Sequence, residues 1–76
     1  MKDFLKYLLS LIVNYPDEVG IEENQASENS FVYLIKANQE DIGKIIGKQG
    51  KIIAAIRNVA KVLAIKENKQ IRIEIA

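Results

Sequence analysis

The residues of this chain best suited to chemistry form a short glycine-bracketed turn, Gly47-Lys48-Gln49-Gly50, which follows Ile46. Glycine has no Cβ and readily adopts positive φ, so Gly47 and Gly50 permit a tight turn and close approach of a ligand to the backbone. A helix beginning after Gly50 presents unpaired N–H groups and the positive end of its dipole. With the Lys48 ammonium at the tip, the turn predicts a site for the phosphates of a nucleic acid.

The composition of the chain excludes most catalytic mechanisms. Its 76 residues include no Cys and no His, which excludes a disulfide, a thiol nucleophile, an imidazole base and the usual zinc ligands. The remaining polar residues show no spacing that pairs a nucleophile with a base. We therefore expect no enzyme activity, no metal and no cofactor.

Two other motifs overlap the glycine turn. Residues 43–49 resemble a nucleotide-binding P-loop, but only three residues separate Gly43 from Gly47, and Gln49 stands where a Mg²⁺-binding Ser or Thr is required. Gly43 and Gly47 also form a small-xxx-small pair of the kind found in membrane helices, but no long apolar segment contains them. We expect neither ATP binding nor membrane insertion, and we assign Gly43 to close packing of a helix against a sheet.

The length and hydropathy of the chain indicate one small soluble domain. A chain of this size buries only about 60% of its unfolded surface. Hydrophobic residues make up 49% and charged residues 28%, as in folded rather than disordered chains. The apolar run over residues 8–13 is too short for a signal peptide, and no segment reaches the ~18 residues of a membrane span. It is interpreted as part of an amphipathic helix, with apolar residues at helical spacing: Leu5, Leu8, Leu9 and Ile12.

Apolar periodicity and capping residues predict an α+β fold with the order helix, strand, strand, helix, helix, strand. Asp3 and Asn38 are the expected N-caps of the first and second helices. A polar loop is expected over residues 26–30, and the strand after it, apolar at nearly every position, is expected at the centre of a sheet. The predicted ranges are helix 4–14, strands 19–24 and 31–37, helix 39–46, turn 47–50, helix 51–65 and strand 70–75.

The last predicted helix has an apolar stripe that is expected to face the core. The stripe consists of Ile52, Ile56, Val59 and Leu63, widened by Ile53, Ala60 and Ala64. The five aromatic residues lie far from the glycine turn in sequence and are expected mostly in core or edge packing.

The element order and the sequence IIGKQGKII resemble a K homology (KH) domain, whose signature is Ile-Gly-x-x-Gly followed by a hydrophobic residue. One helix ahead of two strands, and one strand after the helix pair, is similar to the type II arrangement. The closer resemblance is to small bacterial single-KH RNA-binding proteins of the KhpA type. It rests on IGKQGK at residues 46–51, Ala-Ile-Arg at 55–57 and Val-Asn-Tyr-Pro at 13–16, and it spans the whole chain as a single KH domain of three strands packed against three helices.

The resemblance implies a cytoplasmic protein that binds single-stranded RNA and acts in post-transcriptional regulation or as an RNA chaperone. It implies that the turn holds the phosphates of about four nucleotides while bases lie in an apolar groove whose floor includes Ile46. Lys44, Lys51 and Arg57 are within reach of flanking phosphates, but each is equally an ordinary solvated helix position. The candidate RNA-binding residues are Ile46, Gly47, Lys48, Gln49, Gly50, Lys51, Lys44 and Arg57.

Two alternatives stay open beside RNA binding. Proteins of this type associate with themselves or with a KH protein of the Jag (KhpB) type, so the chain is alternatively a dimerisation module with weak or assembly-dependent RNA binding. The glycine pair is alternatively a helix-to-helix turn without a ligand. Single-stranded DNA is not excluded as the target, because contacts to the 2′-OH leave no sequence signature.

Charge is divided unevenly along the chain. Residues 1–35 hold two lysines and six acidic residues, a net charge of −4, whereas residues 36–76 hold nine basic and four acidic residues, a net charge of +5. The basic half carries the glycine turn. Because the overall charge is only +1, a short single strand is favoured over a long duplex. The acidic segment 22–30 is expected to face away from the turn, since it would repel phosphate.

Overall fold

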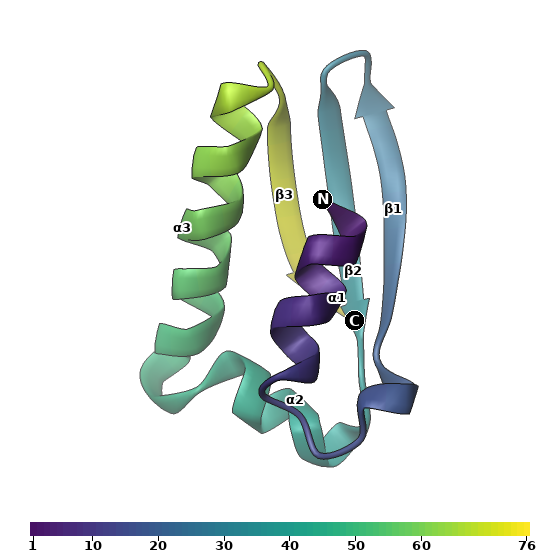
Figure 1. Cartoon of the computed structure of the whole chain (residues 1–76), viewed down its shortest axis with the longest axis vertical. Helices are drawn as coiled ribbons and strands as arrows, with labels where there is room; N and C mark the ends of the chain where they lie inside the picture. Colours follow the sequence, from purple (N-terminus) through teal and green to yellow (C-terminus); the bar gives the residue numbers. More distant parts are fainter.

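A computed structural model describes all residues from 1 to 76 and has the predicted α+β element order (Figure 1). Two short 3-10 turns, at Pro16–Glu18 and Lys48–Gly50, interrupt the connections between these elements. The helices and strands are α1 (Lys2–Ser10), β1 (Gly20–Ser27), β2 (Ser30–Lys36), α2 (Gln39–Ile46), α3 (Lys51–Lys66) and β3 (Gln70–Ile75).

The three strands form one sheet in the order β1-β2-β3, so β2 lies at its centre as predicted. β1 and β2 are antiparallel, with Ile21 opposite Ile35, and β2 and β3 are parallel, with Tyr33 opposite Ile73. Both outer strands, β1 and β3, therefore have one edge without a strand partner.

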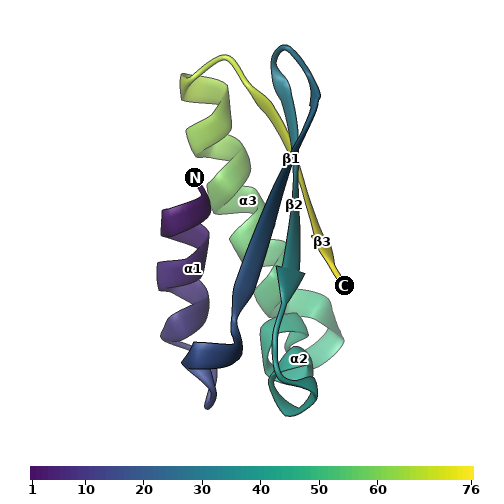
Figure 2. The ribbon, with the colours of Figure 1, turned by 90° about the vertical axis from the view of Figure 1, so that its right-hand side faces the viewer.

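The core lies between the sheet and the helices on one side of it. Figure 2 shows α1 and α3 side by side against this face, with α2 at the end of the sheet where α3 begins. Side chains from every element except the 3-10 turns are buried there: Leu5, Leu9, Ile21, Tyr33, Ile35, Ile45, Ile53, Ile56, Ala60 and Ile73. No helix of the structure has the length and apolar character needed to cross a membrane.

The first helix and the first strand differ from their predicted ranges. α1 covers Lys2–Ser10 rather than 4–14, and its N-cap is Met1, not Asp3. It ends early because the chain turns after Ser10 and the N–H groups of Asn14 and Tyr15 bind the carboxylate of Asp41 instead of helix carbonyls.

β1 continues through Ser27 and β2 begins at Ser30, so the predicted polar loop 26–30 is reduced to a tight turn at residues 28–29. Backbone pairing to β2 extends β1 although its side chains from Glu22 onward are exposed, because an edge strand needs no apolar face there. The other helices and strands lie within one residue of the predicted ranges.

The buried face of α3 is rotated relative to the predicted stripe. Ile53, Ile56, Ala60 and Ala64 are buried, whereas Ile52 is 37% exposed and Val59 is 47% exposed. Apolar residues occupy two sides of this helix, so periodicity alone does not identify the side that meets the sheet. The second side is left at the surface.

Two of the aromatic residues also lie outside the core. Tyr7 is 63% exposed and Tyr15 is 42% exposed, whereas Tyr33 is buried and Phe4 and Phe31 are half-buried. Three of the five aromatics are therefore buried or half-buried, fewer than the roughly four in five expected in core or edge packing.

Candidate nucleic-acid interface

The turn between α2 and α3 has a backbone that ordinary residues rarely adopt. Gly47 has φ 75° and ψ 174°, a region that is essentially restricted to glycine, and Gly50 has φ 73°. A Cβ added to Gly47 would lie 2.5–2.9 Å from side-chain atoms of Ile52, so the position also excludes a side chain sterically. Gln49 adopts φ 58° without being glycine. The turn is thus a specific strained conformation rather than a generic helix end.

The hydrogen bonds of this turn leave two adjacent donors open. Gly47 N–H donates to the Gly43 carbonyl (2.9 Å), and Gly50 N–H donates to the Gly47 carbonyl (3.1 Å). No oxygen of the chain accepts a hydrogen bond from the N–H of Lys48 or Gln49. Successive free backbone N–H groups in a turn form a concave site for an anion, and the exposed Lys48 side chain adds a positive charge beside them.

A buried carboxylate fixes the helix that leads into the turn. Asp41, in the first turn of α2, has no exposed surface, and its two oxygens accept hydrogen bonds from Asn14 N–H (2.9 Å) and Tyr15 N–H (3.0 Å). The predicted cap is present as well, because Asn38 Oδ1 accepts from Glu40 N–H at 2.8 Å. These contacts hold α2 against the α1–β1 connection and so position the glycine turn at its end.

A cavity of the surface lies between α3 and the free edge of β3. This cavity has a volume of about 370 Å³, and its lining residues are Arg57, Lys61, Ile71, Arg72, Ile73 and Glu74. Arg57 Nε donates to the Ile73 carbonyl (3.2 Å), and Arg72 Nε lies 3.1 Å from Glu74 Oε1. Figure 1 shows that α3 begins at the glycine turn and runs alongside β3. The lining of the cavity begins at Arg57, about two helical turns beyond Gly50.

The candidate residues predicted from sequence fall into three places: the α3–β3 cavity, the end of α2 and the start of α3. Arg57 lines the α3–β3 cavity, whereas Ile46, 37% exposed at the end of α2, lines none of the cavities. Lys44 is exposed on the last turn of α2. The remaining candidates lie together at the start of α3: Gly47, Lys48, Gln49, Gly50 and Lys51.

Sequence reasoning did not single out Lys61 and Arg72, although both line the cavity. Lys61 follows Arg57 by one helical turn, which was a readable signal. The position of Arg72 depends on which strand forms the free edge of the sheet, and the sequence does not carry that information in any local pattern.

The acidic segment lies away from the turn, as predicted. The β1–β2 hairpin is at the opposite end of the molecule from the α2–α3 turn (Figure 1). Glu28 lies at the hairpin tip, whereas Glu22 is at the base of the hairpin, where it pairs with Lys36 (3.4 Å). The tip of the acidic segment is therefore remote from the glycine turn, and the charge of Glu22 at its base is paired with a lysine.

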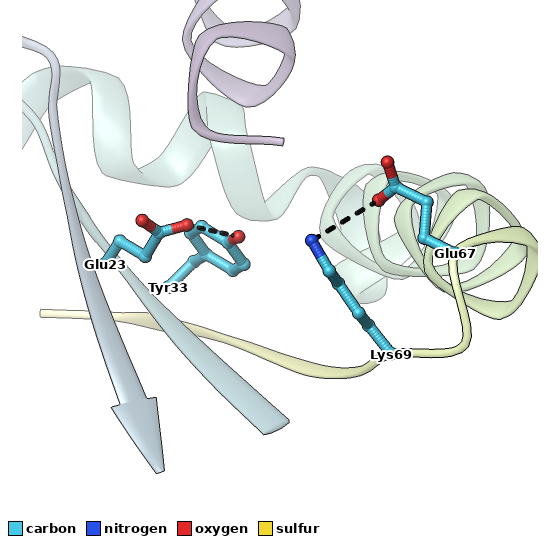
Figure 3. A network of polar contacts seen from close by, with 4 residues as sticks. All are labelled: Glu23, Tyr33, Glu67 and Lys69. Atoms are coloured by element: carbon cyan, nitrogen blue, oxygen red, sulfur yellow. Dashed lines mark hydrogen bonds and ion pairs between the residues drawn. The ribbon is translucent and has the colours of Figure 1, made fainter. Parts of the chain in front are cut away.

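A polar network lies on the helix-facing side of the sheet (Figure 3). Tyr33 Oη donates to Glu23 Oε1 (2.6 Å), and Lys69 Nζ lies 4.0 Å from Glu67 Oε2. Burial, and then the hydrogen bond and charge of Glu23, raise the pKa of the Tyr33 phenol well above its usual range. The phenol therefore stays a hydrogen-bond donor at neutral pH, and this network ties β1 to β2.

Gly43 has no close neighbour, contrary to the sequence-based expectation. A Cβ added there would have nothing within 4 Å, and the residue is exposed on α2. Close packing of helix against sheet does not explain this glycine, and nothing in the structure does.

Three helices on one side of a three-stranded sheet, with a Gly-x-x-Gly turn joining the last two helices, define a KH domain. A family model described as "KhpA/KhpB, KH domain" matches residues 2–75. Over 75 residues the chain is 45% identical to RNA-binding protein KhpA of Clostridium acetobutylicum, covering 99% of both chains. It is 41% identical to RNA-binding protein KhpA of Chlamydia caviae, covering 99% of this chain and 95% of that one.

The chain therefore belongs to the KhpA/KhpB family of KH domains. This family is a non-enzymatic class, in agreement with the absence of catalytic spacings in the sequence. The comparison with solved structures gives no match.

Proposed function

We propose that this chain binds short single-stranded RNA, with phosphates on the glycine turn and bases in the α3–β3 groove. The observation that carries the proposal is the pair of open N–H groups at Lys48 and Gln49, next to an exposed ammonium and a glycine that admits no side chain. The names of the relatives, RNA-binding protein KhpA, support RNA as the ligand.

Different residues of the chain contact the RNA phosphates and the RNA bases. The N–H groups of Lys48 and Gln49 donate to a phosphate, and Lys48 and Lys51 add charge that is free of internal ion pairs, since neither belongs to an ion pair of the structure. The half-buried Ile71 and the Arg57 side chain form a surface on which bases can stack or pack. Phosphate contacts set the position of the strand, and base contacts set any preference for sequence.

We further propose that the chain acts in post-transcriptional regulation or as an RNA chaperone, and that it does so in the cytoplasm. Because the ligand is charged, its affinity falls as salt rises, with a slope set by the number of phosphates contacted.

The proposal is tested by titrating fluorescein-labelled single-stranded RNA at two salt concentrations and following anisotropy. The double variant Lys48→Asp/Gln49→Asp keeps both glycines and reverses the charge at the tip. The matched control Lys2→Asp/Gln25→Asp makes the same changes at exposed positions away from the turn. We expect the first variant to lose at least tenfold in affinity and the control less than twofold, with circular dichroism confirming that both fold. Equal affinities for all three proteins would contradict the proposal.

A specific observation also favours the second candidate function, a protein-interaction module. Several apolar side chains on the outer side of α3 are exposed: Ile52, Val59, Val62 and Ile65. An uncovered apolar stripe on a helix suits association with a second copy or with a KhpB-type partner, and the family description KhpA/KhpB is consistent with such a pair. Sedimentation of the wild type and of Val59→Asp distinguishes the candidates: loss of a dimer in the variant supports association, and a monomer for both contradicts self-association.

A further inference from the structure

The groove between α3 and β3 does not end at the cavity that contains Arg57. A second cavity of about 210 Å³ follows toward the end of α3, and its lining residues are Lys61, Ala64, Ile65, Lys69, Gln70 and Ile71. Lys61 and Ile71 line both cavities, so the two are neighbouring parts of one groove. At 1.5 Å rise per residue, Lys61 is about 16 Å from Gly50 along the helix, beyond the first turns of α3 that adjoin the glycine turn.

The second cavity has the mixed lining that a single-stranded nucleic acid requires. Ile65 and Ile71 provide apolar surface, and Ile65 is 71% exposed. The free edge of β3 adds unpaired backbone N–H and C=O groups along the other wall, because β3 pairs only with β2. Apolar surface beside open hydrogen-bonding groups suits bases better than it suits a small charged ligand.

Among the cations of the groove, Lys61 is the one whose side chain makes neither a hydrogen bond nor an ion pair. Arg57 is held at the Ile73 carbonyl, and Arg72 pairs with Glu74. The ammonium of Lys69 is 5.3 Å from the centre of the Phe31 ring and 4.0 Å from Glu67, on the helix-facing side of the sheet (Figure 3). Lys61 belongs to no ion pair, so its ammonium can neutralise a phosphate without first losing an internal partner.

We propose that the second cavity, together with Lys61 at its boundary with the first, binds nucleotides that continue from those held at the glycine turn. We call this part of the groove the upper groove. The domain would then bind a strand longer than four nucleotides. The inference rests on the proposed function, since the strand enters at the turn. It is carried by the continuity of the two cavities, by the free charge of Lys61 and by the open edge of β3.

The test compares RNA of two lengths. Fluorescein-labelled oligouridylates of four and eight nucleotides are titrated against the wild type, Lys61→Glu and Lys61→Gln. The control is Lys66→Glu, an equal charge change on the same helix at a residue that lines a cavity on the α1 side of α3 instead. We expect Lys61→Glu to weaken the eight-nucleotide RNA by five- to tenfold, Lys61→Gln by two- to threefold and Lys66→Glu by less than twofold. Because Lys61 also borders the first cavity, Lys61→Glu is expected to weaken the four-nucleotide RNA as well, but by no more than two- to threefold.

The outcomes separate this inference from the function on which it rests. If the shorter RNA binds through Lys48 and Gln49 but Lys61→Glu and Lys66→Glu weaken the longer RNA equally, the upper groove is not a binding site and the proposed function stands. If the longer RNA binds no more tightly than the shorter one, the inference is likewise overturned. If either RNA binds the Lys48→Asp/Gln49→Asp variant as tightly as the wild type, both the inference and the proposed function are overturned. Ile65 and Lys69 line the second cavity but not the first, so shifts of their amide signals with the longer RNA alone support the inference directly.

Discussion

Two connections at the same end of this domain treat their backbone N–H groups in opposite ways. In the connection between α1 and β1, the N–H groups of Asn14 and Tyr15 are bound by the buried carboxylate of Asp41. In the connection between α2 and α3, the adjacent N–H groups of Lys48 and Gln49 have no acceptor in the chain. The N–H groups of the first connection are bound by a carboxylate of the chain itself, and those of the second are available to an anion from outside.

The difference shows how one short helix serves both stability and binding. Asp41 begins α2 and fastens it to the neighbouring connection, and the glycine turn ends α2 and stays free. Unpaired backbone donors are costly when they are buried but not at the surface, where water satisfies them until a ligand arrives. The rigid end of α2 therefore pre-organises the open end, which lowers the entropy that binding must overcome.

The largest effect is expected from breaking the closed connection. Asp41→Ala removes the acceptor of two hydrogen bonds to a buried charge and leaves both N–H groups without a partner, so we expect a loss of about 3 kcal/mol in the free energy of unfolding. Urea denaturation measures this value. Asp17→Ala, a change of the same type at an exposed residue in the same connection, is the control and is expected to cost less than about 0.5 kcal/mol. Equal stability of the two variants would show that the carboxylate does not secure α2.

The open connection is tested by giving it a side chain. Gly47→Ala places a methyl group against Ile52 in a backbone region that only glycine adopts easily, and we expect a loss of about 2 kcal/mol. Gly43→Ala is the matched control on the preceding helical turn. Its new methyl group meets nothing within 4 Å, and alanine favours a helix, so a gain of roughly 0.5–1 kcal/mol is expected. Thermal or urea unfolding of the pair decides the point, and equal signs for both would refute it.

A smaller effect is expected at the other internal carboxylate contact, Glu23 with Tyr33. Tyr33→Phe removes one hydrogen bond rather than two, so we expect a loss of about 1 kcal/mol at pH 7. The folded-state pKa of Tyr33 is raised, so its contribution is complete below the ordinary phenol pKa of about 10 and is lost as pH rises above that value. The stability difference between wild type and variant should therefore shrink from pH 9 to pH 11 in urea titrations. A difference that grows over this range would contradict the assignment.

The element order and the glycine turn were readable from the sequence because each rests on a local signal. The turn needs glycine at positions 47 and 50, and the central strand needs an unbroken apolar run, and both requirements appear as residue types. The role of Asp41 was not readable, since its partners Asn14 and Tyr15 are more than 25 residues away and contribute only backbone. The predicted end of the first helix at residue 14 was wrong for the same reason.

The groove was only partly predictable because α3 is apolar on two sides. Periodicity assigned Ile52 and Val59 to the core together with Ile53 and Ala60. Packing against the sheet buries only Ile53 and Ala60 of these four. The rotation of α3 and the free edge of β3 together determine which cations face the groove. Arg57 was predicted only because it is close to the glycine turn in sequence, and Lys61 was not predicted. Tertiary packing decided this outcome among faces of nearly equal hydrophobicity.

The contrast between the two connections is tested most directly by following backbone amide signals in ¹H–¹⁵N spectra while a four-nucleotide single-stranded RNA is added. The account predicts that the amide protons of Lys48 and Gln49 move furthest downfield, as new hydrogen bonds to phosphate form, and that those of Asn14 and Tyr15 stay in place. Spectra in which the Lys48 and Gln49 signals do not move while others on the surface do would contradict it, because the RNA would then be bound without the open turn.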